Sequence, residues 1–147
     1  MKIVTIYKRK NKIIIVSNHR TTDGVWIEPG LCKVVTEPLK PEDIGAVVCE
    51  ALKDSRNDVP HPRNWNGFTK NLEAAAGVKS YATFLNGTKS CSVELSNEYR
   101  CCPYHNGGSK GADKGFHKIG GNEISLPSYA SLAKIGQAVL KTLEKCN

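Results

Sequence analysis

Apolar residues recur along this chain with the two periods that distinguish strands from helices. Near the N-terminus, the runs 2–7 and 12–16 are rich in β-branched residues. They flank the charged segment Lys8-Arg9-Lys10-Asn11, and this arrangement predicts a β-hairpin. The chain is therefore expected to begin as antiparallel sheet.

Two longer segments have the 3.6-residue period of amphipathic helices. Pro41 suits a first helical position, and Glu42 and Asp43 complement the helix dipole. A helix is therefore predicted from Pro41 to near Ser55, and a closing helix is predicted from Ser128, a suitable N-cap residue. The apolar positions are Ile44, Val47, Val48, Ala51 and Leu52 in the first helix, and Leu132, Ile135, Val139, Leu140 and Leu143 in the second.

The remaining periodic segments are shorter. Residues 69–76 predict a short helix that ends at Gly77, while Pro29-Gly30 and Asn86-Gly87 are turn signals. Strands are predicted at 24–28, 31–35, 78–85, 91–95, 98–102, 116–119 and 123–126. The order of elements predicts an α+β fold, a single domain over residues 1–147 with a mostly antiparallel sheet and two main helices packed against it.

The segment 53–68 leaves the first helix and becomes a stiff, aromatic-bearing link. Pro60 and Pro62 fix their own φ angles and favour extended conformations in the residues before them. The link therefore delivers Trp65 and Phe68 to a defined place. Two interpretations follow: Trp65 closes the core as a buried plug, or the link presents a shaped surface to a partner.

The charge of the chain is positive and unevenly distributed. Its 147 residues have a net charge of +7, with +5 over residues 1–40, −3 over residues 41–60 and +5 over residues 61–147. A basic surface favours an acidic partner, either nucleic acid or an acidic protein face. Nucleic-acid binding is not expected, because the aromatic residues do not form the spaced stacking platform of single-strand binders.

Candidate catalytic and metal-binding residues do not form a recognisable motif. His61, His105 and His117 are far apart in the sequence and have no accompanying nucleophile motif, so scattered loop histidines are expected rather than an active site. Cys101 and Cys102 are adjacent on a predicted strand and would point to opposite faces, which disfavours a shared zinc ion. No catalytic residue, metal or cofactor is therefore expected.

The chain shows no feature of a membrane or secreted protein. No apolar run approaches the ~20 residues that a membrane span needs. Lys8, Arg9 and Lys10 interrupt the N-terminal apolar stretch before it reaches the length of a signal peptide. The six cysteines are therefore expected to be free thiols and not to form a disulfide framework. A cytoplasmic location is expected.

Short motifs follow one another in a characteristic order over about residues 20–145. They are Ile44-Gly45 through Ala51-Leu52 leading into Ser55-Arg56, Val59-Pro60-His61-Pro62 with Trp65, Ala75-Ala76-Gly77-Val78-Lys79-Ser80-Tyr81 with Phe84, and Gly115-Phe116. Together they resemble the immunity proteins of bacterial contact-dependent growth inhibition, the CdiI family. The resemblance implies a small non-catalytic protein that binds and neutralises a cognate C-terminal toxin domain, often a nuclease.

The residues expected to contact such a toxin are chosen by chemistry, because the resemblance supplies none. Aromatic and arginine side chains dominate binding energy at interfaces, and glycine-rich loops such as 105–115 often act in binding. The predicted partner-binding residues are Arg63, Tyr104, His105, Lys110 and Lys114.

Two other functions remain open from the sequence. A basic nucleic-acid-binding protein would lose affinity steeply with added salt and would need no protein partner. A small enzyme would need its histidines to converge, so that single alanine replacements abolish turnover.

Overall fold

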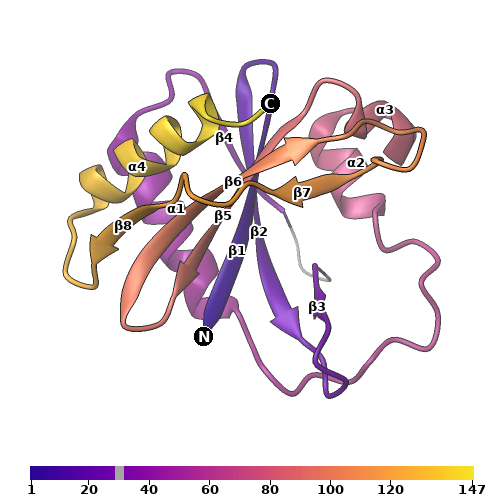
Figure 1. The fold of residues 1–147 in the computed structure, drawn as a ribbon, viewed down its shortest axis with the longest axis horizontal. Helices are drawn as coiled ribbons and strands as arrows, with labels where there is room; N and C mark the ends of the chain where they lie inside the picture. The colour runs from indigo at the N-terminus through magenta and orange to yellow at the C-terminus, as the bar shows by residue number, and fades with distance from the viewer. Residues whose placement is uncertain (29–31) are drawn as a thin grey trace.

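The predicted N-terminal hairpin lies at the centre of a curled antiparallel sheet (Figure 1). The computed structural model of the chain describes residues 1–28 and 32–147. The strands found there are β1 (Lys2–Arg9), β2 (Lys12–Arg20), β3 (Trp26–Ile27), β4 (Lys33–Thr36), β5 (Lys89–Leu95), β6 (Glu98–Asn106), β7 (Phe116–Lys118) and β8 (Ile124–Pro127). Their order is β3-β2-β1-β5-β6-β7, with β4 also paired to β2 and β8 to β6.

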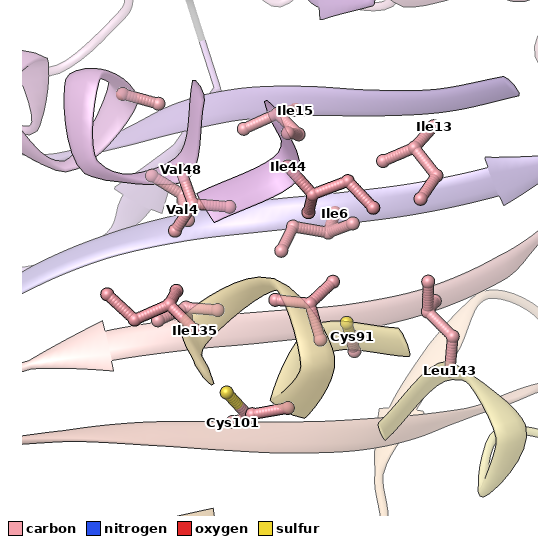
Figure 2. Close-up of a cluster of buried hydrophobic side chains, with 14 of the residues drawn as sticks. Val4, Ile6, Ile13, Ile15, Ile44, Val48, Cys91, Cys101, Ile135 and Leu143 are labelled. Atoms are coloured by element: carbon pink, nitrogen blue, oxygen red, sulfur yellow. The ribbon is translucent and has the colours of Figure 1, made fainter. Parts of the chain in front are cut away.

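Two helices, α1 (Pro41–Asp54) and α4 (Leu132–Glu144), pack together on one face of this sheet. Neighbouring residues of a strand point to opposite faces, so β1 directs Val4 and Ile6 towards these helices. Figure 2 labels the buried cluster that results: Val4, Ile6, Ile13, Ile15, Ile44, Val48, Cys91, Cys101, Ile135 and Leu143. This cluster is the larger of the two cores. Each fully buried aliphatic side chain in it stabilises the folded state by about 1.5–3 kcal/mol.

Glycines allow α1 and α4 to approach very closely. A Cβ atom added at Gly45 would lie 2.0 Å from the carbonyl oxygen of Leu132, and one added at Gly136 would lie 1.8 Å from the carbonyl oxygen of Pro41. Both neighbours are backbone atoms, which cannot rotate away. The backbones of the two helices therefore touch at two points that only glycine permits.

Two short helices, α2 (Lys70–Ala76) and α3 (Tyr81–Leu85), lie on the opposite face of the sheet. Phe84 is fully buried there, with its ring 5.1 Å from that of Tyr7 and 5.8 Å from that of Tyr81. The buried cluster on this side comprises Tyr7, Ile14, Val16, Leu72, Ala76 and Phe84. The sheet is thus covered on both faces, with a smaller core under α2 and α3.

Basic residues of the N-terminal hairpin hold the ends of these short helices. Lys12 Nζ donates a hydrogen bond to the carbonyl oxygen of Ala75 at 2.8 Å. The Arg9 guanidinium donates to the carbonyl oxygens of Phe84 at 3.3 Å and Asn86 at 2.5 Å. Cations stabilise helix C-termini, where carbonyl groups lack partners within the helix.

The predicted α+β fold is confirmed, and so are most of its elements. The hairpin, the first helix with its end at Ser55 and the short helix that ends at Gly77 form as expected. Gly77 has a φ angle of 72°, which explains why a glycine stands there. The extended runs after β2 become β3 and β4, while the Pro29-Gly30 turn signal lies outside the described residues.

Two predicted elements are wrong. The strand predicted at 78–85 does not form: Tyr81–Leu85 are the helix α3, because the Ser80 side chain accepts the backbone N–H of Thr83 and caps a helical turn. The closing helix is capped by Ser131, whose side chain accepts the N–H of Lys134, and not by Ser128. Leu132 accordingly lies at the start of α4 and is 44% exposed, although it was expected on the apolar face.

None of the helices in the described part of the chain combines the length and apolar character that crossing a membrane requires.

Candidate functional site

A cleft of about 280 Å³ opens on the side of the sheet that carries α2 and α3. Its walls come from the sheet, from β3 and the residue after it, from the link that follows α1, and from α2 and α3. The lining residues are Tyr7, Val16, Asn18, Val25, Trp26, Ile27, Glu28, Cys32, Trp65, Phe68, Thr69, Asn71, Leu72 and Tyr81. Five of them are aromatic, half of the ten aromatic residues in the chain.

A tyrosine–glutamate pair lies in this cleft. The Tyr7 hydroxyl donates to the Glu28 carboxylate, with distances of 2.8 Å to Oε1 and 2.9 Å to Oε2. Burial raises the pKa of Glu28, and hydrogen bonding by Tyr7 and Thr5 opposes that rise. Burial and the nearby Glu28 also raise the pKa values of Tyr7 and Tyr81. Cys32 has its pKa raised to about 11 by the same two causes. The tyrosines and the thiol are therefore neutral near pH 7.

The raised pKa of Glu28 makes stability depend on pH in a defined direction. At pH values just above 4.5, the ordinary pKa of a glutamate, the folded state still holds a proton on Glu28 that the unfolded chain has released. This group's contribution to stability therefore falls as the pH rises from that value through the folded pKa. We expect the wild type to lose more stability than Glu28→Gln in urea unfolding as the pH rises from 4.5 through the folded pKa of Glu28.

The exposed Glu123→Gln variant is the control for this measurement, because it makes the same change of charge outside the cleft. Its pH profile should follow that of the wild type. A Glu28→Gln profile parallel to the wild type would contradict the prediction.

The link after α1 supplies the outer wall of the cleft. Backbone hydrogen bonds tie Val59 to the end of β2, from Val59 N–H to Arg20 O at 3.1 Å and from Thr22 N–H to Val59 O at 2.9 Å. The Trp65 ring then packs 5.6 Å from His61 and 5.0 Å from Phe68. Trp65 is 51% exposed, so it is not a buried plug, and the structure favours the interpretation of a shaped surface.

The glycine-rich loop passes beside α3 (Figure 1). Tyr81 joins the two regions, because it lines the cleft and also a second hollow of about 260 Å³ with Ser109 and Lys114. Ser109 Oγ donates to Asn86 Oδ1 at 3.3 Å, and Asn106 Nδ2 donates to Leu85 O at 2.6 Å. The loop is thus anchored against the C-terminal end of α3.

The predicted partner-binding residues are only partly brought together. Tyr104 is half-buried on β6, and strand alternation places it on the cleft side, while His105 faces the side of α4. Lys110 and Lys114 are exposed in the loop. Arg63 is exposed on the link, two residues before Trp65.

Two of the three candidate histidines, His61, His105 and His117, converge, which the sequence did not predict. His105 and His117 pair across β6 and β7, and both face Asp113. His105 Nε2 lies 2.8 Å from Asp113 Oδ2, and its Nδ1 lies 2.6 Å from Asn147 Oδ1. Hydrogen bonds to Asn147 and Asp113 raise the pKa of His105. The expectation of scattered histidines is wrong for this pair and right for His61, which lies beside Trp65.

The adjacent cysteines point to opposite faces, as predicted. Cys101 belongs to the core under α1 and α4, where burial raises its pKa to about 12. Cys102 Sγ lies 3.7 Å from Glu94 Oε2 on the other face. Within residues 1–28 and 32–147, no three His, Cys, Asp or Glu side chains are grouped to hold a metal ion.

Comparison with known proteins decides the family. Residues 30–146 match the family model described as CdiI, CDI immunity protein. The chain belongs to the CDI immunity protein family. This confirms the resemblance found in the short motifs, and it makes the chain an immunity protein of contact-dependent growth inhibition.

Solved structures share the fold of this immunity protein. A protein of unknown function, NMB0488 from Neisseria meningitidis, aligns with a TM-score of 0.81 at 15% identity, covering 99% of this chain and 95% of that one. A chain of the CdiA-CT/CdiI toxin and immunity complex from Yersinia pseudotuberculosis aligns with a TM-score of 0.79 at 15% identity, covering 99% and 97%. No curated protein matches the sequence.

Proposed function

We propose that this immunity protein acts in the cytoplasm by binding the C-terminal toxin domain of its own contact-dependent growth inhibition system, without catalysing a reaction. The match of residues 30–146 to the immunity family carries this proposal. One chain of the Yersinia pseudotuberculosis complex shares the fold of this protein, and the toxin in that complex is a CdiA-CT domain. A toxin domain of the same kind is the proposed partner here. We further propose that this toxin is a nuclease.

The proposed contact surface is the side of the sheet that carries α2 and α3. On this side the cleft and the hollow beside the glycine-rich loop adjoin at Tyr81. Trp65 exposes half of its surface there, and solvent-exposed tryptophans next to clefts are frequent anchors at protein interfaces. The other side of the sheet is filled by the packed helices α1 and α4.

A rescue assay tests the proposed function. The toxin domain encoded immediately upstream would be expressed in a sensitive host, with and without this protein. Growth is expected to be restored by this protein and not by an immunity protein from another system. Toxicity without rescue, despite soluble expression of the immunity protein, would contradict the proposal and make salt-dependent nucleic-acid binding the next test.

Alanine replacements at Tyr104 and Lys110 test the predicted contacts. Each is expected to weaken toxin binding by about tenfold, the loss typical of a moderate interface anchor, without lowering the melting temperature. Calorimetric titration with the toxin domain measures the first effect, and thermal unfolding the second. Lys134→Ala, an exposed lysine on α4, should leave both unchanged. Unchanged affinity in both test variants would remove this part of the surface from the interface.

A further inference from the structure

The cleft has a charge opposite to that of the chain. The net charge of the protein is +7, yet the described residues that line the cleft include no lysine, arginine or histidine. Glu28 is the one carboxylate among them. No cation within the described residues forms an ion pair with it. The cleft is therefore a small acidic site on a basic protein.

Glu28 also has unused capacity to accept hydrogen bonds. An ionised carboxylate offers about four acceptor sites. A neutral hydroxyl, that of Tyr7, donates to it, and the neighbouring Thr5 hydroxyl donates to Asn18 Oδ1 at 3.0 Å. Glu28 is half-buried, and a carboxylate withdrawn from water without a cationic partner is costly; a cation that enters the cleft offsets much of that cost.

The walls of the cleft suit a cationic side chain. Tyr7, Trp26, Trp65, Phe68 and Tyr81 surround the space. Faces of aromatic rings attract ammonium and guanidinium groups, most strongly where water is excluded. The volume of about 280 Å³ is just below the range of pockets for drug-sized ligands, so it fits one long side chain better than a whole small molecule.

We propose that this cleft is a socket for one arginine or lysine side chain of the toxin domain, with the Glu28 carboxylate as its counter-charge and the aromatic walls around its stem. The proposal rests on the proposed function, because the cation comes from the toxin. It also accounts for how a basic immunity protein binds a toxin that itself presents positive charge: the contact is made at a local acidic site and not by the overall charge.

Glu28→Gln is the central test, because glutamine keeps the shape and can still accept the Tyr7 hydroxyl. We expect toxin affinity, measured by calorimetric titration, to fall at least about tenfold, as for other buried charge pairs that lose one partner. The melting temperature should not fall. The control is Glu123→Gln, which has the same change of net charge at an exposed position and should bind as the wild type does.

Trp65→Leu provides a second variant that does not depend on the carboxylate. Leucine retains an apolar side chain at this half-exposed position but removes the π face, so a several-fold loss of affinity is expected. An unchanged affinity would argue against an aromatic wall for the cation.

A double-mutant cycle identifies the partner. Each arginine and lysine of the toxin domain would be replaced by methionine in turn and titrated against the wild type and Glu28→Gln. One toxin residue should weaken binding at least about tenfold with the wild type and have little effect with Glu28→Gln. If no toxin cation couples to Glu28, or if Glu28→Gln binds as tightly as Glu123→Gln, the socket is overturned while rescue by the wild type still upholds the proposed function. If the wild type itself does not bind the toxin, both are overturned.

Discussion

Replacement of Phe84 by alanine is expected to lower the free energy of unfolding by about 3–5 kcal/mol. Phe84 is fully buried between the sheet and α3, and its ring contacts those of Tyr7 and Tyr81. Its removal leaves a cavity that these neighbours fill only in part. Urea unfolding measures the loss, and the melting temperature should fall by roughly 10 °C or more for a chain of this size.

The same replacement should also change the shape of the cleft, because the rings of Tyr7 and Tyr81 that contact Phe84 both line it. Tyr129→Ala is the matched control: it removes an aromatic ring that is 87% exposed and should change stability by no more than about 0.5 kcal/mol. A loss below about 1 kcal/mol for Phe84→Ala would show that the smaller core contributes little to folding.

Gly136→Ala is expected to destabilise the protein by about 2 kcal/mol, although alanine is the better helix former. Alanine at a helix interior gains about 1 kcal/mol over glycine, whereas overpacking a close contact costs about 1–3 kcal/mol and sometimes more. Here the added Cβ would lie 1.8 Å from the Pro41 carbonyl oxygen, a backbone atom. The clash is relieved only if α1 and α4 separate, so the upper end of the range applies.

Gly120→Ala distinguishes this clash from a general effect of losing a glycine. A Cβ at Gly120 meets no atom within 4 Å, and this residue is not among the glycines with positive φ. It should therefore be neutral or slightly stabilising in thermal unfolding. If Gly136→Ala were as stable as Gly120→Ala, the close approach of the two helices would not be a constraint on the fold.

The parts of the fold that could be predicted are those determined by local sequence. The hairpin around Lys8–Asn11 and the helix that starts at Pro41 each carry their own periodicity and end signals. The strand predicted at 78–85 was wrong because its apolar residues fit both periods, and the hydrogen bond that the Ser80 side chain accepts from the Thr83 N–H favours a helix. Such short segments follow their capping residues and tertiary contacts more than their pattern.

The candidate site was much less predictable. Tyr7 and Glu28 meet only because β3 pairs with the far end of β2 while β1 occupies the centre of the sheet. Neither residue carries a local signal of this kind of pairing. The sequence predicts that Trp65 and Phe68 are held in a defined place, because the prolines before them stiffen the chain. Their actual position depends on the backbone hydrogen bonds between Val59 and the end of β2, which the sequence does not reveal.

The contacts of Arg9 and Lys12 with α2 and α3 change how the net charge of the protein should be understood. These two cations are directed at the terminal carbonyl groups of helices, so part of the basic charge at the hairpin serves the interior of the fold and is not offered to solvent as a free binding patch. A polyanion could recruit them only by uncapping those helices and loosening the cleft they support. The counted charge of +7 thus overstates the attraction that an approaching nucleic acid would meet, because Arg9 and Lys12 are tied to folding.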